Sequence, residues 1–399
     1  MPLTLPPLID ALRQRLAEEV SPEAGAARTF FAPGRVNLLG AHQDYVGGFV
    51  LPCAIDRGTY VVASAREDAR LTLRSLDREP ALELDLRSLP GASDARFGWG
   101  NYAIGVLRAI REEGIELRGM DLVIGGDLPI GAGLSSSASL SLACALAACG
   151  IAEQEMPRRR LAECVRRGEN EFVGVRCGIL DPYACSLARA GHALFIDCLE
   201  GTIEHVPFPT ESLSIAVCDT GLRRSLTDGR FNQRVGECSS ALERLRQRWP
   251  ELRALRDVDT RHLELGRDLL DPVLEKRVRH VSEETPRCRR GAAALRSGDL
   301  ETFGAAIDAS HESCRRWYEI SCPELDWIAD RGRELPFVLG TRLTGAGFGG
   351  CTVALLRAGS ELEYREAVEA PYAARFQRRA TVHFFSAGAG ARELDPIAS

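Results

Sequence analysis

Charged side chains and glycines are crowded together near the start of the chain, in a pattern suited to a small polar ligand. Between Pro33 and Tyr45 the sequence reads Pro-Gly-Arg-Val-Asn-Leu-Leu-Gly-Ala-His-Gln-Asp-Tyr. Arg35, His42 and Asp44 supply charge and hydrogen-bonding groups. The glycines between them allow backbone groups to approach a ligand closely. We therefore expect this stretch to line a binding site.

A second run of small residues is typical of phosphate binding. Residues 129–138 read Pro-Ile-Gly-Ala-Gly-Leu-Ser-Ser-Ser-Ala and lie between a predicted strand and a predicted helix. Backbone N–H groups, serine hydroxyls and the positive end of the helix dipole would together attract an anion. The alternative is an ordinary loop with serine caps. The expected phosphate-binding residues are Gly131, Gly133, Leu134, Ser135, Ser136 and Ser137.

A carboxylate in an apolar setting is the candidate for proton transfer. Asp181 follows Gly178 in the run Cys-Gly-Ile-Leu-Asp-Pro-Tyr. There it could accept a proton from a substrate hydroxyl. It could equally be a helix N-cap, because Pro182 suits a first helical position. On the residues alone the N-cap is the simpler interpretation.

Several classes of phosphotransfer and covalent chemistry are disfavoured because Lys276 is the only lysine. A Walker-type loop needs Gly-Lys-Ser/Thr, which does not occur in the sequence. Protein-kinase chemistry needs a strand lysine paired with a helix glutamate, and Lys276 is a poor candidate for it. Schiff-base chemistry is disfavoured for the same reason.

Composition places the chain among globular proteins with ample core. Its 399 residues suggest two domains or one large domain, and a net charge of −6 argues against a nucleic-acid partner. The 13 cysteines include no Cys-x-x-Cys pair, so no zinc cluster is indicated. The sequence shows no signal peptide, and its most apolar helix, about residues 138–152, is short for a bilayer span. We expect a cytoplasmic protein with no membrane contact and infer no required protein partner.

The predicted elements indicate an α+β fold, because strands and helices mix without regular βαβ alternation. Helices are expected over residues 7–19, 99–113, 138–152 and 157–173, and across most of 230–317. An extended region runs from residue 29 to 74, with strands at 60–65 and 71–75, and further strands are expected at 81–86, 120–124, 193–197, 215–219, 351–356 and 380–386. A second glycine-rich loop, residues 344–350, precedes the strand at 351–356.

These three motifs, in this order, resemble the signatures of galactokinases in the GHMP family of small-molecule kinases. The resemblance extends from about residue 28 to residue 394. It implies a GHMP kinase fold with an N-terminal domain like domain 2 of ribosomal protein S5, expected at residues 1–210. It also implies a C-terminal ferredoxin-like α/β-sandwich domain, expected at residues 211–399. ATP and Mg²⁺ are the implied cofactors, and a small-molecule sugar is the implied partner.

The resemblance assigns roles to individual residues. Asp181 would be the catalytic base toward the anomeric hydroxyl, with Arg35 as its electrostatic partner. Ser137 and Glu169 would hold Mg²⁺. Further ATP contacts are expected from the segment with Trp99 and Tyr102, otherwise a core aromatic pair, and from the loop with Gly345 and Gly347.

The implied sugar contacts include two departures from the galactokinase pattern. The contacts themselves would come from Ala41, His42, Asp44, Gly178, Phe231 and Arg230. Galactokinases have a glutamate where this chain has Ala41, and Phe231 stands where they have a tyrosine. Losing the glutamate removes a contact to the C6 hydroxyl and would admit a C6 carboxylate, which Arg223, Arg224 or Arg230 could pair with.

We therefore expect a sugar 1-kinase that prefers D-galacturonate. D-galactose and L-arabinose are the alternatives, and a non-catalytic sugar sensor on the same fold is a further one. A kinase for a non-sugar alcohol is disfavoured by the first motif.

Overall fold

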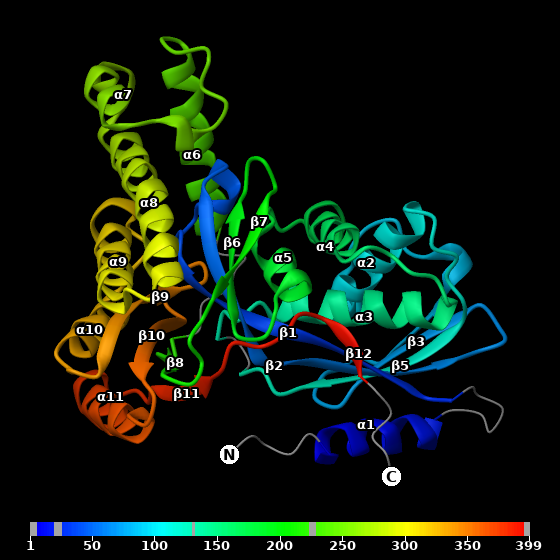
Figure 1. Cartoon of the computed structure of the whole chain (residues 1–399). Coiled ribbons are helices and arrows are strands. Elements are labelled where there is room, and N and C mark those ends of the chain that lie inside the picture. The colour runs from blue at the N-terminus through cyan, green and yellow to red at the C-terminus, as the bar shows by residue number, and fades with distance from the viewer. Residues whose placement is uncertain (1–5, 20–25, 130–131, 223–228, 395–399) are drawn as a thin grey trace.

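The computed structural model describes residues 6–19, 26–129, 132–222 and 229–394, and it confirms a mixed α+β architecture built on two sheets (Figure 1). The helices are α1 (Pro6–Glu19), α2 (Gly100–Glu112), α3 (Ser136–Ala152), α4 (Arg158–Arg167), α5 (Leu180–Leu187), α6 (Arg230–Arg246), α7 (Thr260–Leu265), α8 (Pro272–Ser297), α9 (Leu300–Ser313), α10 (Pro323–Arg333) and α11 (Glu361–Phe376). The strands are β1 (Arg28–Leu39), β2 (Phe49–Ala65), β3 (Arg70–Ser75), β4 (Leu82–Asp85), β5 (Met120–Gly126), β6 (His192–Asp197), β7 (Ile203–Pro207), β8 (Leu213–Asp219), β9 (Val338–Thr344), β10 (Cys351–Arg357), β11 (Thr381–Phe385) and β12 (Arg392–Leu394).

The larger sheet is covered by helices on both faces. Its strand order is β12-β1-β2-β5-β3-β4, and β6 and β7 extend it from β2. Successive side chains of β2 alternate between the faces, as the strand geometry requires. Val61 and Ala63 pack in the cluster that contains α2 and α3, while Tyr60 and Val62 pack against α1. Helix α3 is apolar on nearly all sides and is accordingly buried.

The smaller sheet is antiparallel, in the order β11-β8-β10-β9. Ala216 and Cys218 of β8 face α10 and α11, while Ile215 and Val217 face the opposite way. That second face packs with residues of α8, α9, β1 and β2, so the two sheets share one hydrophobic cluster. Strand β12 returns to pair with β1 of the larger sheet. The end of β1 and the start of β2 therefore lie where the two sheets meet.

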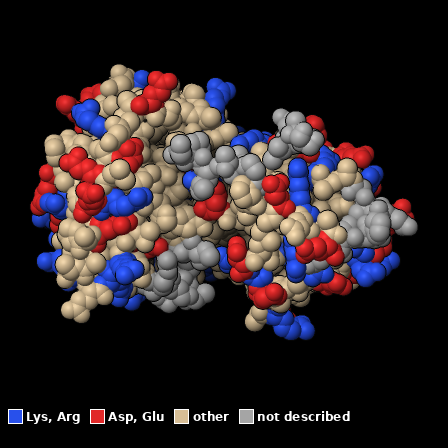
Figure 2. Space-filling model, turned by 90° about the horizontal axis from the view of Figure 1, so that it is seen from below, with Lys and Arg blue, Asp and Glu red and all other residues tan. Residues whose placement is uncertain are grey.

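Most expected elements are present, with differences at their ends. The helix expected over 157–173 ends as α4 at Arg167, and residues 168–173 continue as a π-helical turn. Strands β7 and β9 and helices α10 and α11 were not predicted as separate elements. No helix within the described ranges is long and apolar enough to cross a membrane. Basic and acidic side chains are interleaved over the face shown in Figure 2.

Candidate active site

The first two motifs meet in the second half of β1, a strand that is buried along almost its whole length. The N–H of Arg35 in β1 donates to the carbonyl of Leu134 at 3.1 Å. The Arg35 guanidinium also donates to the carbonyl of Gly133 at 2.8 Å. A side chain at Gly34 would stand 2.7 Å from the Leu134 carbonyl, so glycine permits this close approach. The arginine of the first motif is thereby fixed against the loop of the second.

Arg35 also binds Asp181, which lies at the start of α5. The guanidinium nitrogens Nη2 and Nε lie 2.5 and 2.6 Å from Asp181 Oδ1. The Arg35 side chain is 7% exposed and that of Asp181 28%. Helix α5 begins at Leu180 with Ile179 as its N-cap, so Asp181 is not the cap that the residues alone suggested. The carboxylate instead pairs with Arg35 of the first motif and remains partly exposed to solvent.

A second carboxylate, that of Asp44, lies against Gly178. An ideal Cβ at Gly178 would lie 2.2 Å from Oδ2 of Asp44, so only a glycine leaves room for that carboxylate. Burial and the charge of Asp181 together raise the pKa of Asp44 to about 6. Asp44 and Asp181 thus belong to one site, although they lie 137 positions apart in the sequence.

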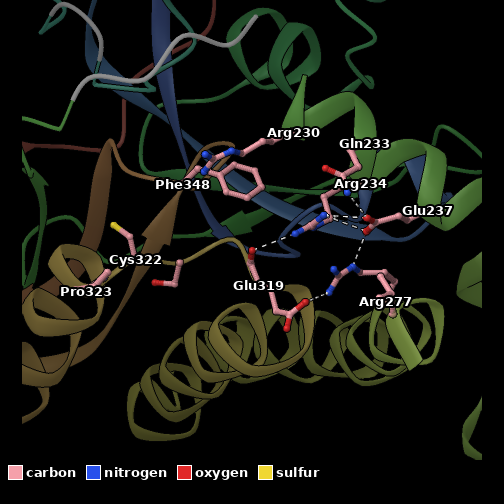
Figure 3. Close-up of a pocket in the computed structure, with 11 residues that line it drawn as sticks. Arg230, Gln233, Arg234, Glu237, Arg277, Glu319, Cys322, Pro323 and Phe348 are labelled. Carbon is pink, nitrogen blue, oxygen red and sulfur yellow. Dashed lines mark hydrogen bonds and ion pairs between the residues drawn. The ribbon is translucent and has the colours of Figure 1, made fainter. Parts of the chain in front are cut away.

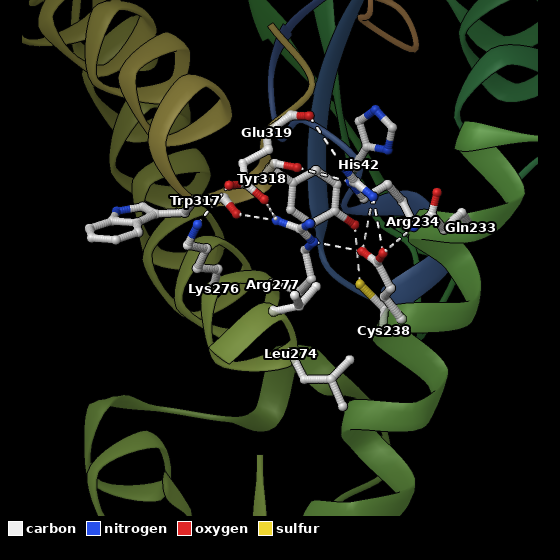
Figure 4. Close-up of polar contacts among 12 residues, drawn as sticks. His42, Gln233, Arg234, Cys238, Leu274, Lys276, Arg277, Trp317, Tyr318 and Glu319 are labelled. Carbon is white, nitrogen blue, oxygen red and sulfur yellow. Dashed lines mark hydrogen bonds and ion pairs between the residues drawn. The ribbon is translucent and has the colours of Figure 1, made fainter. Parts of the chain in front are cut away.

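His42 is held by a chain of hydrogen bonds. Its ring lies 5.1 Å from that of Tyr318, and Figure 4 shows both residues with the polar side chains around them. The Nε2 of His42 lies 3.2 Å from the carbonyl of Ala346, which can only accept, so Nε2 carries the proton. Its Nδ1 lies 2.7 Å from the hydroxyl of Tyr45, which lies 2.6 Å from that of Tyr318. Burial lowers the pKa of His42 to about 3, so the ring is neutral at ordinary pH. The ring of Phe231 lies 5.5 Å from that of His42.

Glu169 and Ser137 meet beside this cluster. Glu169 is 4% exposed in the π-helical turn, and burial raises its pKa to about 6 although the hydroxyl of Ser137 favours the ionised form. Its Oε2 accepts from Cys177 Sγ at 3.0 Å, while its Oε1 is buried without a hydrogen-bond partner among the described residues. Tyr102 is close enough to Glu169 for that charge to contribute to a raised tyrosine pKa. A buried oxygen beside a hydroxyl suits a hard cation.

The third motif packs between the other two. A Cβ at Gly345 would lie 3.3 Å from the carbonyl of Gly133, and one at Gly347 would lie 2.4 Å from that of Ile320. Between them the carbonyl of Ala346 contacts His42. The loop therefore touches both the phosphate loop and the first motif.

The other predicted phosphate-loop residues have different environments. Gly131 lies outside the described residues. Leu134 is buried in the shared hydrophobic cluster and offers only its backbone. Ser135 has a positive φ of 59°, and its hydroxyl is buried without a described hydrogen-bond partner. Ser136 begins α3, so its N–H lies at the positive end of that helix.

The described contacts of Trp99 and Arg230 do not include Arg35, Asp44 or Asp181. Trp99 is 8% exposed and packs in the core behind the larger sheet, which is the alternative weighed for it. Arg230 is exposed on α6, with its guanidinium 5.5 Å from the ring centre of Phe348. Arg230 and Phe348 line a pocket of about 560 Å³. Arg234, Glu237 and Arg277 are among the other residues that line it (Figure 3). Arg223 and Arg224 lie outside the described residues.

Sequence reasoning missed the polar residues that support the first motif from the C-terminal half. Tyr318 reaches His42 through Tyr45, and its own hydroxyl lies 3.1 Å from Cys238 Sγ. His280 and Glu284 of α8 bind the backbone next to His42. The available signal was their spacing, because a histidine and a glutamate four residues apart share one face of a helix.

Family models match three parts of the chain. Residues 18–65 match the galactokinase galactose-binding signature, residues 101–189 the N-terminal domain of GHMP kinases and residues 292–374 the C-terminal domain of GHMP kinases. The first two ranges contain Arg35, Asp44, Glu169 and Asp181, which the structure brings together.

Known proteins resemble the chain over nearly its whole length. A galactokinase of a Roseiflexus species is 41% identical over 359 residues, covering 90% of this chain and 91% of the relative. A galactokinase of Halalkalibacterium halodurans is 36% identical and covers 92% of each. The crystal structure of Lactococcus lactis galactokinase complexed with galactose is 33% identical, with a TM-score of 0.92 over 97% of this chain and 100% of that one. Mevalonate kinase of Methanococcus jannaschii, 20% identical with a TM-score of 0.65, shares the fold.

Proposed function

The chain belongs to the galactokinase family of GHMP kinases and is an ATP-dependent sugar 1-kinase, and we propose that the sugar it phosphorylates is D-galactose. The main support for an active site here is that Arg35 binds both the phosphate loop and Asp181. Asp44 lies against Gly178, three residues before Asp181. The named relatives are galactokinases, and one was solved with galactose. They support the galactose alternative better than the expected preference for galacturonate, which rests on Ala41.

In this proposal Asp181 takes the proton of the C1 hydroxyl as that oxygen attacks the γ-phosphorus of ATP, and the bond from the γ-phosphorus to the bridging oxygen breaks to release ADP. Its carboxylate is the partly exposed member of the pair, so it is accessible to a substrate. Arg35, bound to both Asp181 and the Gly133 carbonyl, places positive charge where the transferring phosphoryl group becomes more negative. Asp44 accepts hydrogen bonds from sugar hydroxyls, and His42 and Gly178 also contact the sugar.

The phosphates of ATP are proposed to lie on residues 133–137. The buried hydroxyl of Ser135 and the first N–H groups of α3 supply donors there. Mg²⁺ would be held by Ser137 and by Glu169, whose unpartnered Oε1 fits a cation ligand, and it would neutralise phosphate charge. One protein carboxylate would be sufficient, because phosphate oxygens and waters would supply the remaining ligands.

D-galacturonate is kept as a second candidate because of one observation. Ala41 is 2% exposed and has no polar side-chain atom, so it can neither accept a bond from a C6 hydroxyl nor repel a C6 carboxylate. A glutamate there would repel that carboxylate by about 1–4 kcal/mol at ~4 Å. Of the three arginines proposed to pair with a C6 carboxylate, Arg230 is the one within the described residues, and its guanidinium packs over the ring of Phe348.

The test is ATP consumption by the wild-type protein with D-galactose, D-galacturonate and L-arabinose at equal concentrations. The phosphorylated carbon of the product is assigned by NMR. We expect the highest kcat/KM with D-galactose and phosphate on C1. Preference for galacturonate would overturn the galactose proposal. Sugar binding without phosphate transfer would support the sensor instead.

A further inference from the structure

We propose that Glu284 is a positioning residue that holds the sugar-binding turn, residues 40–44, in shape from the C-terminal half of the chain. This inference deepens the proposed function and rests on it. Glu284 lies in α8, and its side chain is 0% exposed. Its Oε1 accepts the backbone N–H groups of Gly40 at 3.0 Å and Ala41 at 3.1 Å. The carboxylate thus binds the two backbone N–H groups that immediately precede His42.

The turn needs such an external partner because its backbone is unusual. Gly40 has a φ of 84° and His42 a φ of 54°, a conformation that side-chain-bearing residues rarely adopt. Residues in such conformations persist where the surroundings fix them. The strand ladder of β1 ends at Leu39, so the next N–H groups have no strand partner. One buried oxygen satisfies both of them.

The charge of Glu284 is compensated within the C-terminal half. Arg287 forms an ion pair with Oε2, and the hydroxyl of Ser310 donates to Oε1 at 2.6 Å. Burial alone would raise the pKa of Glu284, but Arg287, His280 and Arg342 lower it to about 2. The group is therefore an anion at every pH at which the enzyme would work. A charged acceptor binds backbone N–H groups more strongly than a neutral one.

His280, one helical turn before Glu284 on α8, binds the same turn of residues 40–44. Its Nε2 donates to the carbonyl of Ala41 at 3.0 Å, and its Nδ1 accepts from Ser313 Oγ at 2.8 Å. Burial lowers the pKa of His280 to about 4, which keeps the ring neutral. Both polar groups of the Ala41 backbone are thus bound by α8. Because His42 follows directly and Asp44 comes two residues later, α8 sets where both side chains lie.

The experiment compares Glu284→Gln with Glu283→Gln in the full-length protein. Glutamine at 284 keeps the oxygen but loses the charge and turns an amide toward Arg287. Glu283 is the matched control because it is the next residue on α8, is 41% exposed and also pairs with Arg287. We expect Glu284→Gln to raise KM for the sugar about 10- to 100-fold, as misplaced binding groups do. KM for ATP should stay within about twofold in both variants.

Equal loss of sugar and ATP affinity in Glu284→Gln, or no change in either, would overturn the proposal. So would an equal effect of Glu283→Gln. If Glu284→Gln does not fold, Ser310→Ala removes one bond to the same oxygen and should raise the sugar KM several-fold with KM for ATP unchanged; an unchanged sugar KM would count against the proposal. The sugar used is whichever one the wild type phosphorylates best. If the wild type shows no turnover, the proposed function fails, and titration calorimetry of sugar binding still tests Glu284.

Discussion

The carboxylate of Asp44 occupies the space that a side chain at residue 178 would need. The two residues come from different elements, the turn after β1 and the segment before α5. An added Cβ at 178 would lie 2.2 Å from Asp44 Oδ2 and 2.7 Å from Cγ. Since Asp181 follows only three residues later, this contact sets the distance between the proposed sugar-binding carboxylate and the proposed base.

Gly178→Ala should therefore weaken sugar binding by displacing Asp44. We expect kcat/KM for the sugar to fall by about 10²-fold, because displacements near 1 Å have effects of that size. Gly236→Ala is the matched control: Gly236 lies within α6, and an added Cβ there meets nothing within 4 Å. Steady-state kinetics check both variants. Equal activities would mean that Asp44 is not where the sugar binds.

Asp181→Asn should abolish most turnover while leaving ATP binding intact. Asparagine keeps the size of the side chain but cannot take a proton from the C1 hydroxyl. Loss of a general base costs about 10²- to 10⁴-fold in kcat. Single-turnover kinetics and ATP titration measure the two effects separately. Undiminished turnover would remove Asp181 from the role of base.

Ala41→Glu should shift selectivity toward galactose and away from galacturonate. A carboxylate at 41 could accept a bond from the C6 hydroxyl and would repel a C6 carboxylate by about 1–4 kcal/mol. The ratio of the two kcat/KM values should then rise at least about fivefold. Ala41→Gln separates the two effects, because it accepts the bond without the charge. An unchanged ratio in both variants would show that residue 41 does not face C6.

The pH profile should fall on the acid side near pH 6. The pKa of Asp44 and that of Glu169 are both raised to about 6, mainly by burial. Below that pH both carboxyls are protonated and lose the ability to accept sugar hydroxyls or bind Mg²⁺, so kcat/KM should drop with a slope of up to about two. Ordinary carboxylates would give a drop near pH 4 instead. Rates between pH 4.5 and 8 distinguish the two cases.

The same shifts carry a prediction for stability without ligands. A carboxyl whose pKa is raised on folding contributes stability at low pH and loses it as the pH rises through the folded-state value. For Asp44 and Glu169 that window runs from about pH 4 to 6. Chemical denaturation of the Asp44→Asn variant should therefore show a smaller stability loss across this window than the wild type does. An identical pH dependence would mean that the pKa of Asp44 is not raised in the free protein.

Glu169→Gln should raise the Mg²⁺ concentration needed for half-maximal activity. The variant replaces a charged ligand by a neutral one, and Mg²⁺ prefers carboxylate oxygens. Glu171→Gln is the matched control, because Glu171 is exposed in the same π-helical turn. Activity is measured across a Mg²⁺ titration at fixed ATP. A larger effect at 171 than at 169 would reassign the metal ligand.

The sequence alone predicted the local parts of this site. The phosphate loop, the turn with His42 and Asp44, and the glycines that leave room for backbone and side chains are contiguous runs, and their chemistry follows from residue type and φ preference. The apolar stretch at residues 138–152 likewise predicted the helix α3, which is buried. The division of the chain near residue 210 stays a prediction.

Only the tertiary structure decided which distant residues meet. Glu284 reaches Gly40 across 244 positions, and Asp181 reaches Arg35 across 146. On the residues alone, Asp181 suited an N-cap and Trp99 suited the core, while the family resemblance implied an ATP contact for Trp99. In the structure Asp181 pairs with Arg35, because a buried guanidinium needs an anionic partner, and Trp99 packs in the core. Spacing along a chain carries no such information, since those choices depend on what lies across the core.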